Sequence, residues 1–349
     1  MRYDLVRAFL FVFLSVAHSQ ITALQAQDED LEELDLAALL DEKIIPANVL
    51  GTHTHMTGEW MVGYTYMLMP MEGMASGTQK LSNADVLQNY MVTPTSMDMQ
   101  MHMFHVMYAP TDDLTLMGMA GYRDNSMDHI TRMGTPFTTT ASGFGDIKLG
   151  GIYHAYRKGF DKERILLSLS VSLPTGSISK TDFLANPAIG KKLLPYPMQL
   201  GSGTFDLHPG IKYINRGERS AWGADLDFTL RLGKNSHEYA LGNSIEAKLW
   251  YRYQLNDWLA PFLQIDAKST GRIKGRDPAL NSMLVPTADP DNQGGKVVYL
   301  QSGFNIFFQG KTLDGQRLAV EFLVPIHQDL NGIQLRTRWH LRGGWQWVF

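Results

Sequence analysis

The chain has 349 residues, of which 44% are hydrophobic and 19% are charged, and its formal net charge is −4. This balance provides no basic surface for nucleic acid, and the absence of cysteine excludes disulfide scaffolds and thiolate metal sites. After the first residues, no apolar run approaches the roughly 20 residues that a membrane-spanning helix needs.

The first residues have the pattern of an export signal. Basic residues precede the short apolar stretch Ala8–Leu14, and the small residues Ala17 and Ser19 follow it. This order is typical of a cleaved signal peptide, whereas a buried N-terminal helix is the alternative. We therefore predict that residues 1–26 form a signal peptide.

An acidic leader follows, and we assign residues 27–57 to the periplasm. In Asp28–Lys43, leucines at 31, 34 and 39 can share one face of a short amphipathic helix. This segment is predicted to plug a barrel mouth or to contact a periplasmic partner. A solvated acidic linker is the competing interpretation.

From residue 58 to residue 349 the chain alternates apolar and polar residues, which is the period of a half-buried strand. In 221–232, for example, Leu226, Phe228 and Leu230 oppose Asp227 and Arg231. The pattern predicts twelve strands, near 58–71, 96–109, 114–124, 143–157, 163–174, 203–216, 220–233, 242–255, 259–270, 296–310, 316–326 and 334–349.

Strand length and loop length distinguish a membrane barrel from a sandwich. Most runs are long enough for the 9–11 residues that a tilted strand needs to cross a bilayer. Short links after every second strand alternate with long ones, such as 175–202 and 269–295, as in transmembrane barrels. The predicted fold class is therefore all-β: an antiparallel barrel in the bacterial outer membrane, with lipid outside and a wet lumen.

The last predicted strand provides a second indication of an outer-membrane barrel. Trp345, Trp347 and Phe349 alternate, so their rings share one face of a strand. An aromatic terminal strand resembles the C-terminal assembly signal of outer-membrane barrels. The alternative is a buried terminal strand in a soluble sandwich.

Methionine is unusually concentrated in one part of the sequence. Of 19 methionines, sixteen lie between Met56 and Met133. In 97–107, methionines and His105 occupy alternate positions, and aromatic and branched residues such as Phe104 and Val106 occupy the others. Because aromatic and aliphatic residues suit lipid, we expect the methionines to point into the lumen from three neighbouring strands.

Thioethers select Cu(I), and imidazole suits copper in either oxidation state. The first hypothesis is therefore a barrel that binds or transports copper along a lumenal track. The predicted track consists of Met61, Met67, Met69, Met99, Met101, Met103, His105, Met107, Met117 and Met119. We predict further ligands in a periplasmic collector, His53, His55 and Met56, and in a surface loop, Met127, His129 and Met133.

Two alternative roles for the methionine track remain open. Methionine provides a flexible apolar surface, so the track would equally suit a passive channel for hydrophobic or aromatic small molecules. The methionines could also serve packing alone. No nucleophile elbow, phosphate loop or orientable Ser–His pair stands out in the sequence, so we predict no enzymatic activity.

Several segments are similar to a known group. They include His53-Thr54-His55, Gly58-Glu59-Trp60-Met61, Met99-Gln100-Met101-His102-Met103 and Gly143-Phe144-Gly145-Asp146. The sequence after Gly51 resembles the outer-membrane protein family named for the meta pathway of phenol degradation. That resemblance implies an outer-membrane barrel that passes aromatic compounds.

Overall fold

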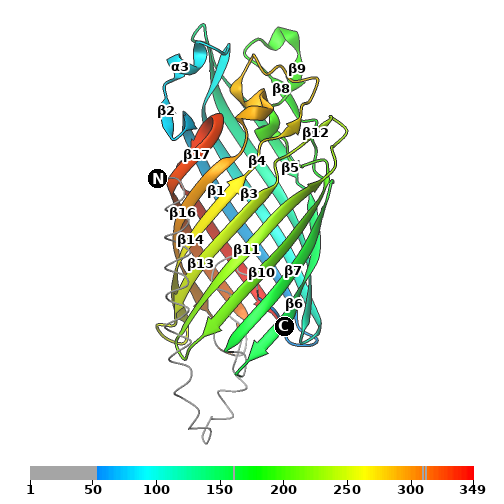
Figure 1. Ribbon diagram of the computed structural model, residues 1–349, viewed down its shortest axis with the longest axis vertical. Coiled ribbons are helices and arrows are strands. Elements are labelled where there is room, and N and C mark those ends of the chain that lie inside the picture. Colours follow the sequence, from blue (N-terminus) through cyan, green and yellow to red (C-terminus); the bar gives the residue numbers. More distant parts are fainter. Residues whose placement is uncertain (1–52, 160–161, 309, 311–312) are drawn as a thin grey trace, which may run out of the picture. The chain divides into compact units, whose positions relative to one another are not determined.

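The computed structural model describes residues 53–349, apart from 160–161, 309 and 311–312 (Figure 1). The signal peptide, the acidic leader and its partner contact lie outside the described residues. No helix in the described part of the chain is long and apolar enough to cross a membrane.

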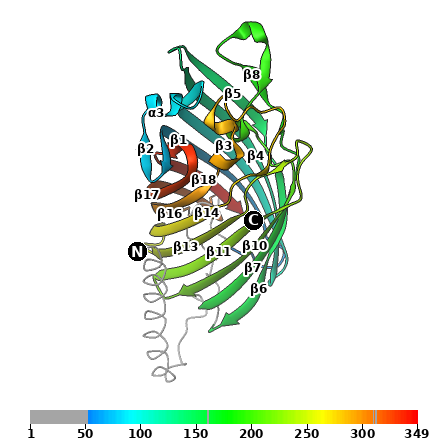
Figure 2. The same ribbon diagram turned by 45° about the horizontal axis from the view of Figure 1, so that its top comes forward.

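The described chain forms a closed antiparallel barrel in which sequence neighbours pair (Figures 1 and 2). The barrel closes because β1 pairs with both β17 and β18. Its twelve strands are β1 (Trp60–Gly77), β3 (Val92–Thr111), β4 (Leu114–Thr131), β6 (Ile147–Lys158), β7 (Glu163–Leu173), β10 (Phe205–Arg216), β11 (Ser220–Leu232), β13 (Ser244–Tyr253), β14 (Leu259–Thr270), β16 (Gly295–Phe307), β17 (Gln316–Thr337) and β18 (His340–Val348). The predicted twelve-stranded barrel is confirmed.

The alternation seen in the sequence sets the two faces of the wall. Leu167, Leu169 and Leu263 are exposed on the outside, whereas Ser170, Ser172 and other polar residues are buried inside. An apolar outer face and a polar lumen are what an outer-membrane barrel requires. Exposed aromatics gather where the turns are short, at Trp60, Tyr153, Tyr156, Tyr251, Trp258 and Trp347.

Three differences from the predicted strands have physical reasons. β3 and β4 run further than expected, and β4 pairs with β5 (Pro136–Phe144), so the predicted loop 124–142 is largely a hairpin. β17 contains a tight turn at Gly332, which has a φ of +65°. After this turn, residues 333–337 pair with β1, and 334–337 form the upper part of the predicted last strand.

The loops between strands at the opposite end carry small elements. Between β1 and β3 lie β2 (Gln79–Leu81) and α3 (Asn83–Leu87). The β7–β10 loop contains β8 (Thr181–Phe183), η2 (Pro187–Ile189), β9 (Lys191–Leu193) and η3 (Tyr196–Met198). The β11–β13 loop contains β12 (Tyr239–Ala240), and the β14–β16 loop contains β15 (Lys274–Gly275), η4 (Pro286–Ala288) and η5 (Pro290–Asn292).

Candidate functional site

The predicted methionine track lines the lumen on three adjacent strands, β1, β3 and β4. We call this surface the methionine wall. Its register is regular, because each inward residue of β3 stands between an inward residue of β1 and one of β4. The rows are Met61–Met107–Met117, Gly63–His105–Met119, Thr65–Met103–Gly121, Met67–Met101–Arg123, Met69–Met99–Asn125 and Met71–Met97–Met127.

Small residues make room for the large ones on this wall. A Cβ on Gly63 would lie 2.1 Å from His105 Nε2, so the histidine ring occupies the space above Gly63. A Cβ on Gly121 would make only ordinary contacts, with Met103 Cγ at 3.6 Å and Met101 Sδ at 3.8 Å. Two of the six rows therefore place a glycine beside larger side chains, and only Gly63 is required to be small.

The predicted collector reaches the end of the lumen with the short turns. His53 Nε2 lies 3.2 Å from Met61 Sδ, and Thr54 Oγ1 lies 2.5 Å from His154 Nε2. The backbone N–H of His55 donates to Thr115 Oγ1 at 3.1 Å. Met56, by contrast, is exposed, so only the two histidines of this predicted group are buried inside the barrel.

The predicted surface-loop group is not in a loop. Met127 and His129 belong to β4, where both are buried, and the His129 ring stacks on Phe137 at 4.7 Å. Met133 is exposed in the turn that follows β4, so the structure does not bring it to the other two. His102 faces outward as its parity indicates, and its Nδ1 lies 2.7 Å from the hydroxyl of Tyr64.

The β7–β10 loop folds over the upper end of the methionine wall. Its Leu194, Met198 and Leu200 are buried and pack in one cluster with Met97 and Met127. Sequence reasoning placed this segment as a long surface loop, because nothing in its composition shows that it turns inward. We call this part of the loop, residues 194–202, the lid.

One carboxylate holds the lid to the barrel. Asp146 lies between β5 and β6, and its Oδ2 accepts hydrogen bonds from the backbone N–H and the hydroxyl of Ser202, at 2.8 and 2.9 Å. Its Oδ1 accepts from the N–H of Gly176 at 2.9 Å. The chain approaches closely here, since a Cβ on Gly201 would lie 2.4 Å from Gly176 O.

Two other loops are tied to the β7–β10 loop, which carries the lid. His237 from the β11–β13 loop lies between Ser179 Oγ, 3.1 Å away, and Asp277 Oδ2, 2.6 Å away. The backbone N–H of Asp277 in turn donates to the Tyr196 hydroxyl at 3.0 Å. Tyr196 packs edge-on against Tyr239, whose pKa burial raises to about 12, so this phenol stays protonated.

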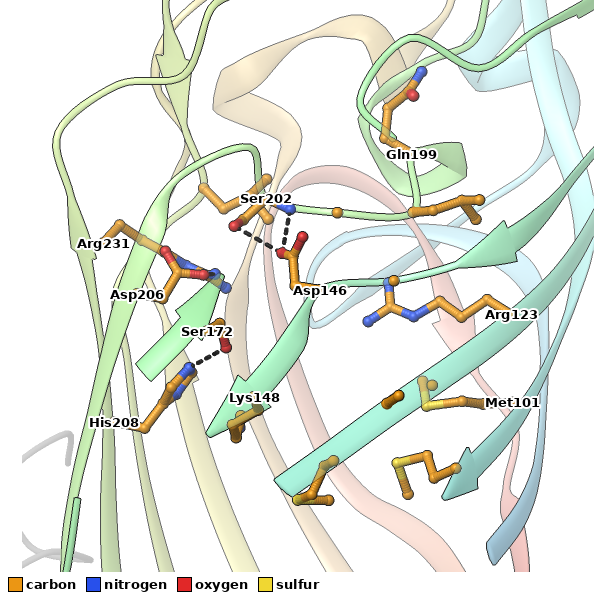
Figure 3. Close-up of a pocket in the computed structure, with 18 of the residues that line it drawn as sticks. Met101, Arg123, Asp146, Lys148, Ser172, Gln199, Ser202, Asp206, His208 and Arg231 are labelled. Atoms are coloured by element: carbon orange, nitrogen blue, oxygen red, sulfur yellow. Dashed lines mark hydrogen bonds and ion pairs between the residues drawn. The ribbon is translucent and has the colours of Figure 1, made fainter. Parts of the chain in front are cut away.

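Beneath the lid lies a cavity of about 500 Å³ (Figure 3). Met101, Met103 and Met119 of the methionine wall form one side. Figure 3 shows Asp206, His208 and Arg231 opposite Arg123 and Met101, with Asp146 and Lys148 between them. The cavity therefore has an apolar side and a charged side, as ligand pockets with a few placed polar groups do.

Sequence reasoning missed the polar half of this cavity. Arg123, Lys148, Asp206, His208 and Arg231 all lie on the lumenal parity of their strands, so alternation alone could have assigned them to the lumen. It could not have shown that they stand at one height, because that depends on the stagger between strands. Asp206 pairs with Arg231, and His208 Nε2 lies 2.8 Å from Ser172 Oγ.

The rest of the lumen, on the strands outside the methionine wall, carries ion pairs. Lys212 Nζ lies 2.9 Å from Asp227 Oδ1 and 3.4 Å from Asp225 Oδ2. Lys248 also pairs with Asp227, at 3.2 Å, and Arg342 pairs with Glu321 at 2.8 Å. We call this surface, on β10, β11, β13, β17 and β18, the charged wall.

Clusters of classical metal ligands bear on the copper hypothesis. Residues 53–349, with their few gaps, contain no group of three or more His, Cys, Asp or Glu side chains that could hold a metal ion. A copper site in this part of the chain would therefore depend on methionine sulfur, with imidazole as a supplement.

No protein-family model matches the sequence, and no curated protein matches it. Among solved structures, an outer-membrane channel from Pseudomonas putida F1 superimposes with a TM-score of 0.61 at 16% identity, covering 88% of this chain and all of the channel. The P. putida toluene transporter TodX (TM-score 0.41, 9% identity, 88% and 99% covered) and the translocator domain of the autotransporter NalP from Neisseria meningitidis (0.44, 10%, 96% and 97%) are more distant. The chain thus has the fold of an outer-membrane channel barrel.

Proposed function

We propose that this protein is an outer-membrane channel that passes small hydrophobic or aromatic molecules through its lumen. The observation that carries the proposal is the cavity beneath the lid, with the thioethers of Met101, Met103 and Met119 along one side. Methionine offers a polarizable apolar surface that adapts to differently shaped guests. The P. putida F1 protein of the same fold is an outer-membrane channel, which supports transport rather than catalysis.

The test is the uptake of labelled toluene by Gram-negative cells depleted of their own porins. Expression of the barrel is expected to accelerate uptake. Replacing Met101, Met103 and Met119 together by Gln, which has a similar shape but a polar amide, should lower the rate several-fold because an apolar guest loses its surface. The matched Leu triple variant should keep the rate, and equal rates with and without the barrel would contradict the proposal.

We propose copper binding as a second candidate function, on a separate observation. His53 Nε2 lies 3.2 Å from Met61 Sδ, and Met61 heads the row that continues through Met107 and Met117. An imidazole beside stacked thioethers is a ligand set suited to Cu(I). This row lies near the short turns, away from the lid cavity, so the two candidates use different parts of the wall.

Anaerobic Cu(I) competition titration of the refolded barrel tests this candidate. The Met61/Met107/Met117→Leu variant should lose binding, whereas the Met101/Met103/Met119→Leu variant, with as many thioethers removed, should retain it. Equal binding by both variants, or none by the unmodified barrel above detergent controls, would exclude this row as a copper site.

A further inference from the structure

We propose that the lid cavity selects apolar molecules that carry one carboxylate, and that Arg123 and Lys148 bind this group. The inference rests on the proposed channel function and narrows its solutes from hydrophobic molecules in general to organic acids with an apolar body. It depends on which charges around the cavity are already paired.

The two acidic groups of the cavity are occupied. Asp206 forms an ion pair with Arg231, and its Oδ1 also accepts from Thr204 Oγ1 at 2.7 Å. Both oxygens of Asp146 accept hydrogen bonds from the lid residues and Gly176. Asp206 is thus paired with a cation, whereas the hydrogen bonds to Asp146 come from neutral groups and leave its negative charge in place.

The two remaining cations have no direct ion-pair partner, although Asp146 attracts Arg123, and Asp206 and Asp227 attract Lys148, at longer range. Within the described part of the chain, Arg123 and Lys148 form no ion pair, and Arg231 is the one cavity cation that is paired with an acidic cavity residue. Three cations thus face two carboxylates. The excess is one positive charge, and the two cations without a direct ion pair come from neighbouring strands, Arg123 from β4 and Lys148 from β6.

Each of these cations stands directly beside a methionine of the wall. Arg123 is in register with Met101, and Lys148 is in register with Met119. A bound molecule can therefore place its charged group on the cations while its apolar body lies along the thioethers. Figure 3 shows Met101 and Arg123 together on one side of the cavity.

The chemistry of the two cations specifies the anion. Guanidinium forms paired hydrogen bonds with a carboxylate, and an ammonium adds a point charge. A neutral hydrocarbon that filled the cavity would displace water from both cations and offer them nothing in return, which is unfavourable. An apolar acid satisfies the cations and the methionines at the same time.

The experiment compares 4-phenylbutyrate with 4-phenylbutanol, which share the same apolar body. Binding to the full barrel in nanodiscs is measured by ligand-detected NMR at neutral pH, with empty nanodiscs subtracted. We expect the acid to bind about ten-fold more tightly than the alcohol, as a charge-assisted contact contributes at least 1.4 kcal/mol in such cases. In R123Q/K148Q this preference should fall to about two-fold or less, because the acid loses its charge-assisted contacts.

Controls separate the charge effect from folding. The exposed Lys192 on β9 provides a matched loss of charge, so K192Q should keep the full preference. R123K/K148R should keep most of it, since both cations remain. Equal binding of acid and alcohol to the unmodified barrel, or an undiminished preference in R123Q/K148Q, overturns the selection and leaves the hydrophobic channel standing. If neither compound binds, the result contradicts both the carboxylate selection and the proposed channel function.

Discussion

The two walls of the lumen are filled by different kinds of side chain. The methionine wall fills its side with flexible apolar chains, and the His105 ring occupies the space above Gly63. The charged wall fills its side with ion pairs that fix each other's position, such as Lys212 between Asp225 and Asp227. The difference indicates that stability resides on the charged wall and adaptability on the methionine wall.

The largest effect should come from breaking the charged wall. Lys212→Met removes a buried cation from the half-buried Asp225 and Asp227, and removing one partner of a buried ion pair costs about 3 kcal/mol. Urea unfolding of the barrel in lipid vesicles measures this free energy. On the other wall, Met103→Leu conserves volume and should cost less than about 1.5 kcal/mol. Equal losses in the two variants would abolish the distinction between the walls.

A smaller loss of stability is expected at Gly63, where the methionine wall has no room for a larger side chain. Gly63→Ala puts a methyl group where His105 lies, and such overpacking costs about 1–3 kcal/mol. The same unfolding assay measures it. The double variant Gly63→Ala/His105→Ala should recover most of the stability, because the ring that obstructs the methyl group is gone. If the double variant is as unstable as Gly63→Ala, the clash with His105 is not the cause.

The smallest effect concerns the lid. His237→Ala removes the link between Ser179 and Asp277 and should cost about 1 kcal/mol locally, without lowering the global free energy of unfolding. Hydrogen exchange should accelerate at lid amides such as those of Leu200 and Gly201, while the barrel strands keep their protection. Lys192→Ala, on the exposed β9, serves as the control. Unchanged exchange in the lid would show that His237 does not hold it.

The sequence predicted the barrel well because alternation is a local property. The inward and outward faces of each strand can be read from its own residues, so the sequence alone assigned the methionines to the lumenal face. The lid is different, since Leu194, Met198 and Leu200 become buried only through contact with distant strands. The cavity cations were equally hidden, because Arg123 and Lys148 meet Met101 and Met119 only through strand stagger. The predicted link between residues 326 and 334 contains the turn at Gly332, but the pairing of the residues after this turn with β1 was not predicted.

The seam between β1 and β18 also bears on the order of folding. Trp60 and Phe349 exchange two backbone hydrogen bonds of 2.9 Å, and Met61 pairs with Val348, so the two ends of the described chain meet in one ladder. Such a pairing joins residues that are far apart in the sequence, and contacts of this kind form slowly because the entropy of closing the loop is lost before the contact is gained. Until the seam forms, both strands present unpaired edges that another chain could extend. Closure is therefore the step at which assembly competes with aggregation.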